Sequence, residues 1–483
     1  MNYRMIMKSI GTVLCIEAAC MLPSLLVAII YRDGGVAPFI FSIIIVAAAG
    51  FGLLRIRTTT SSIYARDGFA IVALGWILVS VFGALPFIFS GAIPSVMDAL
   101  FESVSGFSTT GASILRDIEA LPKGILFWRS FTHWMGGMGV LILMIAILPS
   151  VKANTLHIMK AEAPGPSPDK FVPKIGQTAK ILYMIYIALT AVEVVFLLVG
   201  GMSLYDALIH AFGTASTGGF SNRNASVAAY GSVYIETVIT VFMLLFGVNF
   251  TLYYMGFKKN IKSILRDEEL RFYFGTVVAA IILIVLNING TIYHSIGESI
   301  RYSAFQVGSI ITTTGYATAD FNLWPAFSQG ILLILMFIGA SAGSTGGGLK
   351  CIRIILLFKI IKREITKVIH PRAVQTVKIN GRVVDEEILS GVMAFFFFSI
   401  LIFAVSVLAV LLEGKDLVTS TTAVIASINN IGPGLGLVGP AGNYADLSIL
   451  SKGVLSICMI VGRLEIYPIM LLVFPSFWKR INI

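Results

Sequence analysis

Four short loops rich in Ser, Thr and Gly lie between long apolar segments of this chain. They contain Thr109-Thr110-Gly111, Ser216-Thr217-Gly218, Thr313-Thr314-Gly315 and, in a fourth version without Thr, Asn430-Ile431-Gly432. Backbone carbonyl oxygens can replace the water shell of K+ without adding net charge, so the ion can also leave again. Gly takes the unusual backbone angles that such loops require without strain from a Cβ atom. We therefore predict that these residues form one K+ filter around a common axis.

The loops differ from the longer TVGYG loops of channels with identical subunits, which carry two glycines. Each loop here has one aligned Gly, and the fourth places Asn430 and Ile431 before it. We therefore expect a shorter and less stringent filter. The alternative is that they are tight re-entrant turns of a protein that is not a channel, because irregular backbone at membrane depth only has to be packed in protein or to line a cavity.

A second cluster of small residues interrupts the apolar segment at 327–361. Its members are Gly339, Gly343, Ser344, Thr345, Gly346, Gly347 and Gly348. Because each Gly costs about 1 kcal/mol relative to Ala in a helix, we predict a break at mid-membrane, where flexible backbone could block or clear a pore. Close helix packing through small residues is the alternative. The segment also matches G-x-S-x-G, but it follows an apolar helix instead of a strand, which disfavours a hydrolase.

Two basic residues lie close to these features. Arg463 is inside the last apolar segment, where a buried arginine costs about 2.5–3.5 kcal/mol. Glu465 is too near in sequence to share its helix face. We expect Arg463 to lie beneath the filter as an electrostatic barrier or as a brace for the Gly-rich segment, with a purely structural salt bridge as the alternative. Lys350, just after that segment, could anchor it to acids or carbonyls.

The elements that must position these residues are membrane helices. The 483-residue chain is 57% hydrophobic and 12% charged, which is typical of a polytopic membrane protein. Hydropathy predicts spans near 10–30, 38–54, 70–89, 124–148, 181–200, 233–255, 272–286, 327–361, 388–412 and 447–473. The loop glycines recur at intervals of roughly one hundred residues, which indicates a parallel repeat.

We therefore predict an all-α polytopic membrane protein in which four membrane–pore-helix–membrane repeats surround one pore, preceded by two extra N-terminal transmembrane helices. The predicted divisions are 1–60 for the N-terminal extension, 61–152 for repeat 1, 153–258 for repeat 2, 259–363 for repeat 3 with its broken second helix, and 364–483 for repeat 4.

Short helices are predicted to lead into the loops. Three begin with a capping pattern, namely Ser95 with Asp98, Ser203 with Asp206, and Ser295 with Glu298. Their C-terminal ends carry about half a negative charge and would favour a cation at the loops. Separately, the alternating residues around Asn380-Gly381 predict a β-hairpin over 377–384. It could serve as a docking surface in the cytosol, and the alternative is a small solvated hairpin without a partner.

The net charge of +10 follows the positive-inside rule and does not indicate nucleic-acid binding. Most Lys and Arg residues fall in loops that alternate with the Gly-containing loops, so we place the former and both termini in the cytoplasm of a bacterial plasma (inner) membrane. The basic residues placed on the outer side are Arg32, Arg116, Lys123, Arg129, Arg223, Arg301, Lys415 and Lys452.

Longer motifs carry a family resemblance. They are Phe101-Glu102-Ser103, Trp134-Met135-Gly136-Gly137-Met138-Gly139, Ala161-Glu162-Ala163-Pro164-Gly165-Pro166, the segment 342–350, His370-Pro371, Gly432-Pro433-Gly434-Leu435-Gly436 and Gly462-Arg463-Leu464-Glu465. With them the chain resembles potassium-uptake channel subunits of the Trk/Ktr/HKT superfamily, and the two extra N-terminal spans favour its TrkH branch.

The resemblance implies four membrane–pore–membrane repeats, a filter lined by Gly111, Gly218, Gly315 and Gly432, and an intramembrane gating loop. It also implies a homodimer in the lipid bilayer and a cytosolic ring of nucleotide-binding, TrkA-like gating subunits. We expect K+ as the transported ion, no covalent cofactor and no enzymatic activity. An H+- or Na+-coupled K+ secondary carrier is the alternative, although such carriers tend to have inverted repeats.

Overall fold

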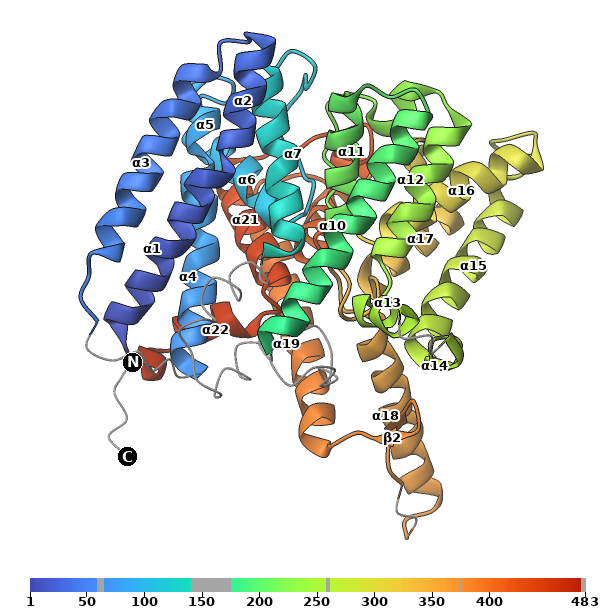
Figure 1. Cartoon of the computed structure of the whole chain (residues 1–483). Helices are drawn as coiled ribbons and strands as arrows, with labels where there is room; N and C mark the ends of the chain where they lie inside the picture. Colours follow the sequence, from blue (N-terminus) through green and yellow to red (C-terminus); the bar gives the residue numbers. More distant parts are fainter. Residues whose placement is uncertain (59–64, 140–174, 258–260, 373–374, 479–483) are drawn as a thin grey trace.

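The protein is a bundle of long, roughly parallel helices (Figure 1). The computed structural model describes residues 1–58, 65–139, 175–257, 261–372 and 375–478. Among these residues, six single helical segments are long and apolar enough to cross a membrane. Large apolar side chains on their outer faces are exposed, for example Phe41, Val195, Leu286 and Leu408. This apolar exterior suits contact with lipid, and the chain is a multi-pass, mostly helical membrane protein.

The first three helices lie within residues 1–60, for which an N-terminal extension was predicted. Helices α1 (Tyr3–Cys20) and α2 (Leu22–Tyr31) make one 29-residue span, and α3 (Val36–Leu54) returns beside them. A Cβ atom on Gly11 would lie only 2.8 Å from the carbonyl oxygen of Gly50. The two glycines therefore allow α1 and α3 to pack backbone against backbone.

The remaining helices follow in four consecutive groups along the chain. The first is α4 (Ala65–Gly83), α5 (Leu85–Phe89), α6 (Val96–Phe107) and α7 (Lys123–Gly137). The second is α10 (Ile175–Val199), α11 (Leu204–Ser216), η2 (Ser226–Tyr230), α12 (Val233–Phe246), α13 (Phe250–Phe257) and α14 (Ile261–Arg266). The third is α15 (Glu268–Ile288), α16 (Ile296–Ile311), η3 (Phe321–Leu323), α17 (Ala326–Ile338) and α18 (Cys351–Ile369). The fourth is α19 (Glu386–Leu411), α20 (Leu417–Ile428), η4 (Gly436–Val438), α21 (Ile449–Arg463), α22 (Tyr467–Val473) and α23 (Pro475–Trp478).

One short helix in each group, α6, α11, α16 or α20, ends where a predicted loop begins. We call these loops 1 (108–112), 2 (216–220), 3 (312–316) and 4 (429–433). The capping prediction is confirmed at Ser95 and Ser203, whose side chains accept hydrogen bonds from backbone N–H groups. It is wrong at Ser295, which precedes α16 but makes no side-chain cap bond. The fourth short helix, α20, is capped by the side chain of Asp416.

Three predicted spans are interrupted. The break between α17 and α18 was expected, but the single span predicted for 233–255 is wrong, because α12 and α13 meet at 90°. The span predicted for 447–473 is also broken, because Glu465 and Ile466 have positive φ angles and separate α21 from α22. Residues 140–148 of the span predicted over 124–148 lie outside the described residues.

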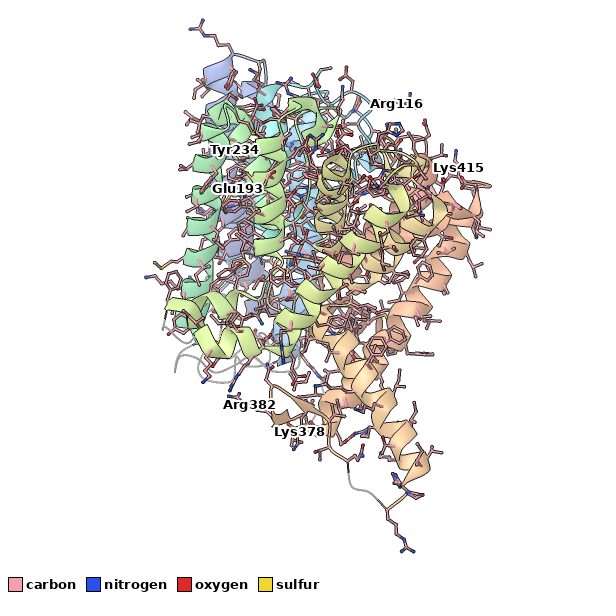
Figure 2. The ribbon with its side chains drawn as sticks, turned by 90° about the vertical axis from the view of Figure 1, so that its right-hand side faces the viewer. Arg116, Glu193, Tyr234, Lys378, Arg382 and Lys415 are labelled. Atoms are coloured by element: carbon pink, nitrogen blue, oxygen red, sulfur yellow. The ribbon has the colours of Figure 1, made fainter. Side chains whose placement is uncertain are left out.

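The only sheet among the described residues is the predicted hairpin, formed by β1 (Lys378–Ile379) and β2 (Arg382–Val383). Asn380 and Gly381 have φ angles of 51° and 77°, as a two-residue type I′ turn requires. Figure 2 shows Lys378 and Arg382 on the part that projects from the bundle, at the opposite end from Arg116 and Lys415.

Candidate functional site

The four loops meet in a closed ring. A Cβ atom added to one glycine of each loop would lie very close to a backbone carbonyl oxygen of the next loop. The distances are 2.1 Å from Gly111 to Gly218, 2.0 Å from Gly219 to Thr314, 2.1 Å from Gly315 to Ile431 and 2.7 Å from Gly432 to Thr110. Each loop therefore packs its glycine against the carbonyl of the next loop, and loop 4 closes on loop 1. Segments that are far apart in the sequence thus surround one axis.

The register in loop 2 differs from the prediction by one residue. In every loop one residue has a left-handed φ angle of 54–61°, and a glycine with φ of 74–100° follows two positions later; the pairs are Thr109 and Gly111, Thr217 and Gly219, Thr313 and Gly315, and Asn430 and Gly432. The equivalent of Gly111 is therefore Gly219 and not Gly218. Helix α11 runs through Ser216, the first residue of loop 2. The Gly-Gly pair made the register ambiguous in the sequence.

The residue before each of these glycines supplies the ring carbonyl, and its amide points the other way. The amides of Thr110, Gly218, Thr314 and Ile431 donate to the carbonyls of Ser105, Gly213, Ser309 and Ala426, at 2.8–2.9 Å. These acceptor carbonyls belong to the last turns of the short helices, where carbonyl groups have no partner within the helix. The same helix ends bring the negative ends of four helix dipoles to the ring.

Hydroxyl and amide side chains brace the loops. The Ser108 and Thr110 hydroxyls lie 2.7 Å apart, and those of Thr312 and Thr314 lie 2.8 Å apart. In loop 4, which lacks Thr, Asn430 Nδ2 donates to Thr110 Oγ1 at 2.9 Å. The asparagine therefore takes over bracing by bonding to loop 1 instead of to its own loop.

Two tyrosines hold the outer side of the ring. Tyr316, directly after the loop 3 glycine, donates from its hydroxyl to the carbonyls of His210 and Phe220 at 3.1 and 3.2 Å, which joins loop 3 to the second group. The Tyr444 hydroxyl donates to the Gly432 carbonyl at 2.7 Å. Both side chains are buried, so their hydroxyls fix backbone positions where water is excluded.

A buried ion pair behind loop 1 was missed at the sequence level. Arg129 is buried in α7 and not in an outer loop, and its Nε lies 2.6 Å from Glu102 Oε1. Arg129 also donates to the Ser221 carbonyl at 3.0 Å, and Glu102 accepts from the Ile114 amide at 3.0 Å. The pair therefore ties the ends of loops 1 and 2 to α6 and α7. The Phe101-Glu102-Ser103 motif was the signal for it.

Just outside the ring is a cavity onto which all four loop glycines open. Its lining includes Arg116, Arg129 and Arg223. Each of them forms an ion pair, with Asp446, Glu102 and Glu119 respectively. The pairing offsets positive charge that would otherwise repel a cation approaching the ring.

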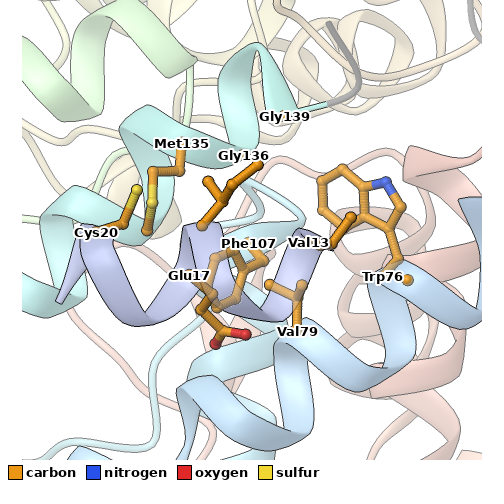
Figure 3. Close-up of a pocket in the computed structure, with 11 residues that line it drawn as sticks. Val13, Glu17, Cys20, Trp76, Val79, Phe107, Met135, Gly136 and Gly139 are labelled. Carbon is orange, nitrogen blue, oxygen red and sulfur yellow. The ribbon is translucent and has the colours of Figure 1, made fainter. Parts of the chain in front are cut away.

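A second cavity lies between α1, α4, α6 and α7 (Figure 3). Apolar side chains such as Val13, Trp76 and Phe107 line it, and Glu17 contributes a buried carboxylate. None of its described lining residues belongs to loops 1–4.

The Gly-rich segment 339–350 is non-helical and lies against loops 3 and 4. The Gly347 amide donates to Thr313 Oγ1 at 2.7 Å. A Cβ atom on Gly347 would lie 2.3 Å from the Asn429 carbonyl, and one on Gly346 would lie 2.9 Å from the Thr312 carbonyl. The structure therefore brings this segment into contact with the ends of α16 and α20, directly beside the ring.

The break between α12 and α13 receives the other side of the segment. The Ser341 amide donates to the Gly247 carbonyl at 3.1 Å, and the Phe250 amide donates to the Gly343 carbonyl at 3.0 Å. A continuous helix would use these backbone groups internally, so the bend exists where the segment docks. Gly247-Val248-Asn249 was the available sequence signal.

Arg463 joins the segment to the first group. Its guanidinium donates to the Thr345 carbonyl at 2.8 Å and to the carbonyls of Gly136 and Gly137 at 2.6 and 3.0 Å. Lys350 donates from its ammonium to the Gly346 carbonyl within the segment.

Glu465 pairs with Arg353 on α18. Helix α21 ends at Arg463, so Glu465 lies just beyond it.

Comparison with known proteins gives a consistent result. The family model described as "TrkH: Cation transport protein" matches residues 35–480. The "Trk system potassium uptake protein TrkH" of Salmonella typhimurium is 39% identical, covering 99% of this chain and 100% of that protein. The "Trk system potassium uptake protein TrkG" of Escherichia coli is 35% identical, covering 99% of both. The crystal structure of the potassium transporter TrkH from Vibrio parahaemolyticus superposes with a TM-score of 0.89 at 37% identity, covering 99% of this chain and 100% of that one.

Proposed function

Because the chain belongs to the TrkH family of cation transport proteins, we propose that it carries K+ across a membrane through the ring of loops 1–4. One observation carries the proposal, namely the closed cycle of approaches in which each loop glycine meets the carbonyl of the next loop. Such a ring offers oxygens without net charge to a dehydrated cation, so binding is favourable but release stays possible. We assign the filter to Thr109–Gly111, Thr217–Gly219, Thr313–Gly315 and Asn430–Gly432.

Segment 339–350 is the proposed gate. It lies beside the ring, contacts loops 3 and 4, and contains enough glycine to change conformation at low cost. Arg463 stabilises its present position by bridging Thr345 to the carbonyls at the end of α7. The guanidinium charge on the same route would also oppose a passing cation. Lys350 holds the segment from within.

The proposed sidedness rests on the distribution of basic residues over the two ends of the bundle. The projecting hairpin and the basic residues beside it lie at one end of the bundle, and the cavity outside the ring lies at the other. By the positive-inside rule, we propose that the hairpin end and both termini face the cytoplasm at a bacterial inner membrane. We further propose a homodimer whose cytoplasmic face binds a ring of nucleotide-binding, TrkA-like subunits.

The test is ion flux through the purified full-length chain in liposomes, measured with K+, Rb+ and Na+ gradients. We expect K+ flux that follows the K+ gradient and membrane potential, and faster flux in Arg463→Ala than in Arg463→Lys, since Lys retains a donor and a charge. Flux in fixed proportion to an H+ or Na+ gradient would instead support a coupled carrier. Absence of K+ flux from the wild-type chain and from both variants would overturn the proposal.

A further inference from the structure

Three consecutive acidic residues at the start of α15, Asp267, Glu268 and Glu269, contact three separate parts of the molecule. We call them the acidic triplet. Asp267 caps α15 by accepting from the Leu270 amide at 2.8 Å. The other contacts of the triplet reach the β1–β2 hairpin, helix α18 and the Gly-rich segment 339–350.

On the hairpin side, the contacts centre on the turn residue Asn380. Its Nδ2 donates to Asp267 Oδ2 at 2.7 Å, and its Oδ1 accepts from the Glu268 amide at 2.9 Å. Its own amide donates to Glu268 Oε1 at 2.8 Å. Lys359 on α18 donates to Glu268 Oε2 and to the Lys378 carbonyl. The hairpin, α18 and the start of α15 are therefore joined by one hydrogen-bonded network.

On the segment side, Glu269 accepts hydrogen bonds near the beginning of the stretch 339–350 and just after its end. Its Oε1 accepts from the Ala342 amide at 2.7 Å and from the Ile352 amide at 3.1 Å. Ile352 is in the first turn of α18, where backbone N–H groups lack intrahelical partners, and Lys350 makes no side-chain cap bond there. Glu269 is buried, so it serves as the cap for α18 from another helix and holds the beginning and end of the segment together.

The hairpin is packed well enough to transmit a displacement. Val377 is buried in an apolar cluster with Leu356 and Ile360 of α18 and Leu389 and Val392 of α19. Because a packed apolar cluster has low compressibility, a displacement of the hairpin moves the nearby part of α18 with it. The hydrogen bonds of Asn380 and Lys359 then pass the displacement to the start of α15, one residue before Glu269.

We propose that the acidic triplet is the mechanical link through which the β1–β2 hairpin controls the position of segment 339–350. Asn380 and Glu269 are positioning residues in this link, and neither contacts the ring of loops. The inference rests on the proposed function in one respect: displacement of the segment changes K+ flux only if the ring conducts K+.

The first test is hydrogen exchange on the full-length chain in detergent micelles, because it reports the link whether or not ions pass. The variant Asn380→Gly removes the two side-chain bonds but keeps a residue that accepts the positive φ angle. Val383→Ala is the matched control, since Val383 is exposed on the same hairpin. We expect exchange at the amides of Ala342 and Ile352 to rise about fivefold in Asn380→Gly, from the loss of two exposed hydrogen bonds, and not in Val383→Ala.

Variants of Glu269 complete the test. Glu269→Ala should speed exchange at both amides more than Asn380→Gly does, and Glu269→Gln, which keeps an acceptor oxygen, should lie between it and the wild type. Adding Asn380→Gly to Glu269→Ala should produce no further increase, because the link is already broken. Independent, additive effects of the two changes would overturn the proposal, as would equal exchange in Asn380→Gly and Val383→Ala.

Ion flux of the same variants in liposomes separates the two hypotheses. If exchange responds as expected and K+ flux rises in Glu269→Ala and Asn380→Gly, both the link and the conducting ring are supported. If exchange responds but no variant passes K+, the proposed function fails and the link stands. If the wild type passes K+ but neither exchange nor flux responds to Asn380→Gly, the link fails and the proposed function stands.

Discussion

Replacing Gly219 by Ala tests the ring at its tightest contact. The added Cβ would lie 2.0 Å from the Thr314 carbonyl oxygen, whereas ordinary van der Waals contact begins at 3.4 Å, so this oxygen must move by about 1.4 Å. A hydrogen bond to a charged group contributes about 1.5–3 kcal/mol, and we use this range for the contact between a carbonyl oxygen and K+. If that oxygen binds K+, its displacement should lower K+ flux by about tenfold or more and reduce discrimination against Na+.

The matched control is Gly201→Ala. Gly201 also has a positive φ angle, 87° against 74° for Gly219, but nothing lies within 4 Å of its added Cβ. Both variants therefore carry the same backbone strain of about 1–2 kcal/mol, and only one disturbs the ring.

The assay is uptake of K+ and Rb+ into liposomes with Na+ competition, together with thermal unfolding of both variants. Equal flux and equal selectivity in two equally folded variants would refute the assignment of the ring as the filter.

Three further changes have defined outcomes. Glu102→Gln leaves Arg129 buried without its carboxylate partner and should lower the free energy of unfolding, measured by denaturant titration, by about 3–5 kcal/mol. The reasoning is contradicted if Glu102→Gln loses less stability than the double variant Glu102→Gln with Arg129→Met. Tyr444→Phe removes the bond to the Gly432 carbonyl and should reduce K+ over Na+ selectivity while costing only about 1 kcal/mol of stability, measured by flux and unfolding together. Hydrogen bonding from the Thr419 amide lowers the pKa of Asp416. The stabilising contribution of Asp416 is therefore present above the usual aspartate pKa of about 3.9 and is lost as the pH falls through the lowered pKa. In Asp416→Asn, the unfolding temperature should depend less on pH over this acidic range.

Hydropathy and glycine spacing were sufficient to predict the helical class, the short helices and the break at 339–350. These features depend on local composition, since membrane spans need about 20 apolar residues and glycine-rich stretches cannot stay helical. The hairpin was equally predictable from the sequence, because Asn380-Gly381 determines its turn locally.

The errors arose where tertiary contacts override local preference. Residues 233–255 read as one apolar span, but backbone groups at Gly247 and Phe250 bond to the Gly-rich segment and force the bend. The register of loop 2 depends on where α11 ends, and Gly218-Gly219 gives no local preference between the two. The Glu102–Arg129 pair joins residues from two helices, which hydropathy alone assigns to different environments.

The closing of the ring by four unlike loops has an evolutionary consequence. In a channel of identical subunits, any substitution in the filter appears at four places at once. Here a single codon change alters one quadrant, and loop 4 already differs, because Asn430 reaches across to Thr110 where the other loops use their own hydroxyls. If the ring is the K+ filter that we propose, natural selection can therefore change ion preference at one loop at a time, while the other three loops keep their positions.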